Sequence, residues 1–144
     1  MMTRVSSAKS VDANHWVGRL AQARDFRKSA EDAVTLASEG QNMNPAVSLM
    51  VSAAIAYSDA LTAQRVGKVN QQDHAAAPKL LRDALGNALP DAQEKRLRKI
   101  LGPKDEVQYG IRSTGLMKAT SYLDDLQQFG DWVEDQLPSP GVPR

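Results

Sequence analysis

The segment from Asn44 to Arg65 constrains the fold most strongly, because it is apolar on almost every side of a helix. A helix that is hydrophobic all round is normally buried among other elements. Asn44 and Pro45 favour its start, the first as an N-cap and the second in the first helical position. Gly67 lies just beyond its expected end. The sequence therefore predicts the central helix of a small bundle.

The same segment has nearly the length of a membrane span, since Ala46 to Ala63 comprises 18 residues. It contains Asp59 and several hydroxyl groups, and a carboxylate is costly to place in lipid. The first ten residues contain no apolar core of the length that a signal peptide needs. We therefore expect a soluble core helix, a cytoplasmic protein and no membrane partner.

Four further segments repeat apolar residues at helical spacing. They cover residues 11–38, 73–88, 91–101 and 113–137. The third helix either begins near Pro78 or has a distorted first turn from Asp73, because proline inside a helix removes a hydrogen bond. We expect His15 and Trp16 to be a helix start and a core anchor. Leu116, Ala119, Leu123, Leu126, Gly130, Val133 and Leu137 form the expected seam of the last helix.

The chain of 144 residues has the size of one domain, and its few aromatic residues and many alanines favour closely packed helices over sheets. We predict an all-α protein, an up-and-down bundle of four to five helices over residues 11–137. Residues 1–10 are expected to be a flexible N-terminus, and residues 138–144 a disordered tail. Gly130 on the seam of the last helix is expected to permit close packing.

Several kinds of chemistry are excluded by composition. The chain has no Cys, which excludes disulfides, zinc sites built on thiolates and Cys nucleophiles, and it has only two His. Gly-rich phosphate loops, the Gly-x-Ser-x-Gly motif and carboxylate pairs at metal spacing are missing. We expect no metal and no cofactor.

Asp59 and His74 are the first candidates for a site. An Asp buried in a bundle needs partners, and Asp59 either orients Arg65, Arg112 or His74 or meets water on a polar edge. His74 follows Asp73 at a helix start, where the helix dipole favours neutral imidazole. It is either a general base or substrate contact, or part of a capping Asp73-His74 pair.

Two other sets of polar residues each have a functional and a structural interpretation. Lys104, Tyr109 and Arg112 lie together in the connection before the last helix, as a binding site or as a solvated loop. Basic residues 95–99 either contact phosphates or are balanced by the acidic last helix, within one chain or across a dimer. Arg19, Arg24, Arg27 and Lys28 are expected on a solvated face of the first helix.

Three segments together resemble the HEPN superfamily of small helical domains. They are Ala53 to Leu61, Gln72 to Leu81 with Asp73 and His74, and Leu101 to Gly110 with Lys104 and Tyr109. The resemblance covers residues 44–137 and implies an up-and-down bundle that commonly dimerises. Many members are ribonucleases of toxin–antitoxin and defence systems, and others bind a partner or a nucleotide.

The catalytic motif of active members does not carry over. They have Arg and His separated by four to six residues near the start of the last long helix, where this chain has Arg112 and no His. The resemblance therefore implies a non-catalytic binding domain, acting as a homodimer or with a protein partner in stress response, toxin–antitoxin function or defence. Its expected binding residues are Asp59, Asp73, His74, Lys104 and Tyr109.

The alternative is an enzyme. It is a metal-independent ribonuclease or nucleotide-processing enzyme whose site combines His74, Tyr109 and Arg112, with RNA or a nucleotide as its partner. Metal-free acid–base chemistry requires these groups within hydrogen-bond reach of one substrate.

Overall fold

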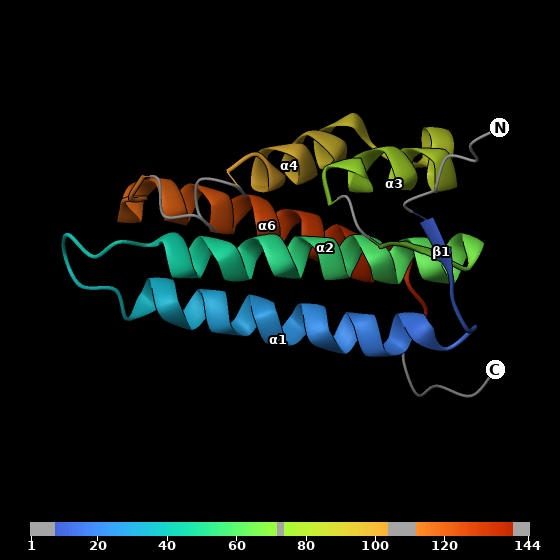
Figure 1. Cartoon of the computed structure of the whole chain (residues 1–144), viewed down its shortest axis with the longest axis horizontal. Helices are drawn as coiled ribbons and strands as arrows, with labels where there is room; N and C mark the ends of the chain where they lie inside the picture. Colours follow the sequence, from blue (N-terminus) through green and yellow to red (C-terminus); the bar gives the residue numbers. More distant parts are fainter. Residues whose placement is uncertain (1–7, 72–73, 104–111, 140–144) are drawn as a thin grey trace, which may run out of the picture.

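The computed structural model describes residues 8–71, 74–103 and 112–139 of the chain (Figure 1). Within them it contains five α-helices and one two-stranded ribbon. The helices are α1 (His15–Thr35), α2 (Asn44–Val66), α3 (Ala77–Leu85), α4 (Asp91–Leu101) and α6 (Leu116–Gln136). The predicted all-α helical bundle is confirmed.

The bundle is built around α2. This helix lies between α1 on one side and α3, α4 and α6 on the others, with α1 antiparallel to it (Figure 1). Met50, Tyr57 and Leu61 of α2 are fully buried. Among the described residues α2 is the one helix long and apolar enough to cross a membrane, and most of that stretch is covered by the other helices. Its all-round hydrophobicity is thus explained by its central position.

The ends of α2 show one confirmed prediction and one wrong one. The helix ends at Val66 and is followed by Gly67, whose φ of +68° is the left-handed conformation that glycine adopts without strain. Asn44 does not act as the N-cap. Its side-chain amide donates to the carbonyl oxygen of Arg112 (2.6 Å), and its Oδ1 accepts from the hydroxyl of Thr114 (2.7 Å). Asn44, expected to cap α2, therefore binds residues that directly precede α6.

The third helix begins near Pro78, which is the first of the two predicted alternatives. A 3-10 turn, His74–Ala76, precedes α3, and Pro78 falls in the first turn of the regular helix. Proline is tolerated there because the first N–H groups of a helix have no partner within it. A second 3-10 turn, Gly86–Ala88, leads from α3 into α4.

The expected flexible N-terminus is wrong for its last three residues. Ala8–Ser10 form strand β1, which pairs antiparallel with β2 (Lys68–Asn70), with Lys9 opposite Val69. Residues 1–7, and residues 140–144 of the predicted tail, lie outside the described residues. Pairing of two three-residue strands leaves almost no period-two pattern in the sequence.

The seam of α6 differs from the prediction at its first residue. Leu116 is 39% exposed, whereas Tyr122 and Phe129 are buried beside the expected Ala119, Leu123 and Leu126. At the other side of the bundle His15 begins α1 and Trp16 packs half-buried against the core, as expected.

Candidate functional site

The candidate site is centred on Asp59, a carboxylate inside the bundle with 4% of its surface exposed. Its Oδ2 accepts a hydrogen bond from the Arg19 guanidinium of α1 (2.8 Å). Its Oδ1 accepts from the backbone N–H of Asn70 in β2 (3.1 Å). One carboxylate therefore joins three elements: α2, α1 and the ribbon.

The local sequence explains how these groups meet. Because α2 is covered on all sides, a polar residue in its C-terminal half must find partners inside the protein. The left-handed turn at Gly67 returns the chain alongside α2, so the Asn70 N–H reaches a carboxylate eleven residues earlier. Arg19 extends from α1, which packs along the full length of α2.

Arg19 lines two hollows. The first has a volume of about 260 Å³ and is lined by Arg19, Phe26, Ser52, Ile55 and His74. The second, of about 290 Å³, is lined by Asn14, His15, Gly18, Arg19 and Gln22. Both histidines of the chain thus line hollows that share one guanidinium. An imidazole, a hydroxyl group and an aromatic ring around a cation suit contact with a small polar ligand.

Burial governs the electrostatics of the site. It raises the pKa of Asp59 above its ordinary value, although the Arg19 guanidinium, the Asn70 N–H and the charge of His74 all act to lower it. Ionised Asp59 is therefore less well solvated in the folded protein than in water, even with its partners in place. Carboxylates perturbed in this way are concentrated at functional sites.

The structure brings together two of the residues singled out from sequence, Asp59 and His74, but not Arg112. The carbonyl oxygen of Arg112 is held by Asn44 at the start of α2. His74 lies beside Ser52 and Ile55, eight and eleven residues further along that helix. At 1.5 Å per residue this places the two backbones roughly 12 to 16 Å apart along the helix axis. Asp73, Lys104 and Tyr109 lie outside the described residues.

The principal partner of Asp59 was missed from sequence. Arg19 was expected on a solvated face, together with Arg24, Arg27 and Lys28. That expectation holds for Lys28, which pairs with the exposed Asp32. It also holds for Arg24, whose side chain is half exposed. Arg19 and Arg27 reach inward, because a side chain just beside the apolar stripe is long enough to carry its charge toward buried groups. The available signal was an Asp in a fully buried helix, which requires a cation from a neighbour.

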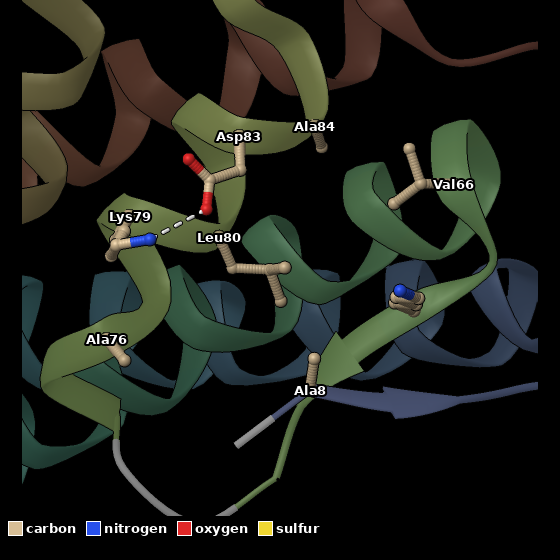
Figure 2. Close-up of a pocket in the computed structure, with 8 residues that line it drawn as sticks. Ala8, Val66, Ala76, Lys79, Leu80, Asp83 and Ala84 are labelled. Carbon is tan, nitrogen blue, oxygen red and sulfur yellow. Dashed lines mark hydrogen bonds and ion pairs between the residues drawn. The ribbon is translucent and has the colours of Figure 1, made fainter. Parts of the chain in front are cut away.

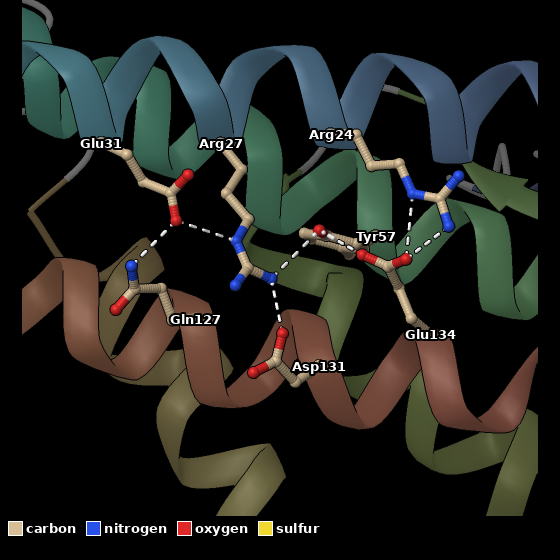
Figure 3. A network of polar contacts seen from close by, with 7 residues as sticks. All are labelled: Arg24, Arg27, Glu31, Tyr57, Gln127, Asp131 and Glu134. Atoms are coloured by element: carbon tan, nitrogen blue, oxygen red, sulfur yellow. Dashed lines mark hydrogen bonds and ion pairs between the residues drawn. The ribbon is translucent and has the colours of Figure 1, made fainter.

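Arg24 and Arg27 belong to a second polar network, between α1, α2 and α6 (Figure 3). The hydroxyl of the buried Tyr57 donates to Glu134 Oε2 (2.9 Å) and accepts from Arg27 (3.4 Å). Arg24 Nε donates to Glu134 Oε1 (2.9 Å), and Arg27 Nη1 donates to Asp131 (2.8 Å). Pairing of residues 24 and 27 with 134 and 131 shows that α6 runs antiparallel to α1.

Burial raises the pKa of Tyr57 to about 12, and Glu134 adds to that rise. Hydrogen bonds to Tyr57 and Asp131 raise the pKa of Arg27 in spite of its own burial. Tyr57 is therefore neutral, and Arg27 charged, at every physiological pH. This network acts as a structural clamp, because its hydrogen bonds and ion pairs join three helices.

The basic residues of α4 are largely balanced within the chain. Lys99 forms an ion pair with Asp125 of α6 (2.6 Å), and Arg96 approaches the same carboxylate (3.9 Å). Arg98 pairs with Glu94 (3.2 Å). Of the two alternatives for these charges, compensation by the last helix of the same chain accounts for two of the four cations.

No cluster of three or more acidic or histidine side chains is placed to hold a metal ion within the part of the chain that the structure describes. Comparisons of the chain with protein-family models, with curated proteins and with solved structures find no match, so the HEPN resemblance stays a prediction.

Proposed function

We propose that this protein is a non-catalytic, HEPN-like binding domain, acting as a homodimer or with a protein partner in stress response, toxin–antitoxin function or defence. The observation that supports it best is that Arg19 and Asp59 form their hydrogen bonds with groups of the protein itself. Arg19 donates to both Asp59 and Gln22, and Asp59 accepts from Arg19 and from Asn70. These groups hold α1, α2 and β2 together, whereas acid–base catalysis requires groups directed at a substrate.

Balanced surface charge supports the same proposal. The chain has a net charge of +1, and two cations of α4 are paired with Asp125 of α6. Binding along an RNA backbone needs several uncompensated cations in a row. A protein surface makes no such demand, so a second copy of the chain or another protein in the cytoplasm is the better partner.

The experiment is an RNA-cleavage assay without added metal, paired with light scattering. The pure protein is expected to leave single-stranded RNA intact and, where the homodimer is the acting form, to have the mass of a dimer. Cleavage that disappears in His74→Ala but persists in Lys28→Ala, a change at an exposed ion pair, would refute the non-catalytic proposal.

A second candidate is a metal-independent ribonuclease or nucleotide-processing enzyme. It is favoured by one observation, namely that His74 lies with Arg19 at a hollow beside a carboxylate of raised pKa. In this form the site uses Arg19 and Asp59 in place of Arg112. It predicts a pH–rate profile whose acidic limb changes in Asp59→Asn; a profile indifferent to that substitution contradicts it.

A further inference from the structure

A third hollow lies away from Arg19, between the ribbon and α3, and has a volume of about 380 Å³ (Figure 2). We call it the α3 groove. Its apolar lining comprises Ala8, Val66, Ala76, Leu80 and Ala84. Its polar lining comprises Lys68, Lys79 and Asp83. The volume falls within the range of small-molecule sites, which are mostly apolar with a few polar groups.

Small side chains create the groove. Three of its five apolar residues are alanines, one on β1, one in the 3-10 turn before α3 and one on α3. Beside them Val66 is 44% exposed and Leu80 is half-buried, so apolar surface remains uncovered at the end of α2 and along α3. A ligand with a compact apolar body would remove this surface from water.

The charges at the rim select the sign of the ligand. Lys79 forms an exposed ion pair with Asp83 (3.0 Å), one turn away on α3 (Figure 2). Lys68 is exposed and has no ion-pair partner among the described residues. The lining therefore carries two cations and one anion, a net charge of +1.

That single excess charge also limits the charge of the ligand. A dianion such as a phosphate monoester calls for several donors and suffers repulsion from Asp83. A monoanion is balanced by Lys68 alone and leaves the Lys79–Asp83 pair intact. We propose that the α3 groove binds a small monocarboxylate with a compact apolar body, whose carboxylate contacts Lys68.

This site is independent of the proposed function, because the α3 groove shares no lining residue with the hollows at Arg19. The test is a titration of the isotope-labelled protein with benzoate, followed by the backbone amide signals in NMR at low ionic strength. Benzoate is expected to shift the amides of Val66, Lys68, Leu80 and Ala84. Benzamide, its neutral isostere, is expected to bind more weakly.

Two variants separate the contributions of charge and shape. Lys68→Gln removes one exposed ion pair with the ligand and should weaken benzoate roughly two- to five-fold while leaving benzamide unchanged. Ala84→Phe fills the groove and should weaken both compounds. Lys118→Gln, a matched change of an exposed lysine on α6, should affect neither.

The proposal is overturned if benzoate shifts none of these amides at millimolar concentration. It is equally overturned if benzamide binds as tightly as benzoate, or if Lys118→Gln weakens benzoate as much as Lys68→Gln does. Lys68 and Lys118 are both exposed, so folding is not at risk in the variants that decide the sign of the ligand.

Discussion

At position 130 the absence of a side chain allows α6 to lie against Tyr57. A Cβ atom there would lie 2.6 Å from Tyr57 Cε2 and 2.8 Å from Cζ, closer than carbon atoms approach in folded proteins. The ring is fully buried and its hydroxyl is held by Glu134, so it has little room to move. Gly130→Ala should therefore lower the free energy of unfolding by about 1 to 3 kcal/mol, measured by urea denaturation.

The matched control is Gly18→Ala in α1, where a Cβ atom would meet nothing within 4 Å. Alanine is favoured over glycine in a helix by up to about 1 kcal/mol, so this substitution should leave stability unchanged or raise it. If Gly130→Ala stabilised the protein as Gly18→Ala does, Tyr57 would not pack on α6 as described.

Asp59 makes the stability of the bundle depend on pH. Its pKa is raised by burial above the ordinary value of 3.8, so the folded chain keeps this proton to a higher pH than the unfolded chain does. Between the two pKa values the folded state binds more protons, and the contribution of Asp59 to stability falls as pH rises. Asp59→Asn cannot titrate and should lack this component.

The measurement is urea unfolding of the wild type and Asp59→Asn at several pH values above and below 3.8. The free energy of unfolding of the wild type, minus that of the variant, should decrease as pH rises through this range. Ser58→Ala, at the buried neighbouring residue, should change stability by an amount independent of pH. A difference between wild type and Asp59→Asn that grew with pH would mean that Arg19 lowers the pKa of Asp59 instead.

Between elements, Glu134 connects α6 to both α1 and α2. It accepts from Tyr57 and from Arg24, and the bond to Glu134 is the principal cause of the raised pKa of Arg24. Glu134→Gln keeps the shape but removes the charge that both donors face. Because Glu134 is partly exposed, we expect a loss of about 1 kcal/mol in urea denaturation.

Asp32→Asn is the control for Glu134→Gln. It removes the exposed ion pair between Lys28 and Asp32. These two residues are four positions apart in α1, so their pair joins no second helix. Such pairs contribute about 0.3 to 0.5 kcal/mol. Equal losses in the two variants would contradict a clamp between helices and would indicate that the α1–α6 ion pairs are ordinary surface contacts.

The sequence predicted elements better than it predicted the contacts between them. The helix starts at Asn44 and Asp91 agree with the proline at or beside each of them, because proline preferences act within a few residues. No side chain caps either helix, so the capping preference was the less useful signal. The partner of Asn44 is Thr114, seventy residues away, and no local pattern encodes it. The β1 strand was missed for the same reason, since its partner is β2.

The residues of the candidate site also differ in whether they could be predicted from the sequence. Asp59 and His74 were found because a carboxylate in an apolar helix and one of two histidines stand out in any sequence. Arg19 was not found, because several cations flank the apolar stripe of α1 and spacing alone does not select one. Only the packing angle of α1 on α2 decides which guanidinium reaches Asp59.

At the scale of the whole molecule, a single core should make the bundle unfold as one unit. The buried residues of α2 form one continuous cluster with those of α1, α3, α4 and α6. Trp16 on α1 and Trp132 on α6 both pack against this cluster from different helices. Tryptophan fluorescence and far-UV circular dichroism should therefore report the same transition, as for a two-state domain.

Leu61→Ala tests whether the bundle unfolds as one unit, since Leu61 is a fully buried member of the cluster. The cavity should cost about 2 to 5 kcal/mol, a large share of the roughly 5 to 15 kcal/mol that stabilises a domain. Both the fluorescence and the dichroism transitions should move to lower urea together. Leu36→Ala removes a side chain that is 79% exposed and should move neither by more than about 0.5 kcal/mol. Separation of the two transitions in Leu61→Ala would show that α1 and α6 are stabilised independently, and that α2 does not serve them as a shared core.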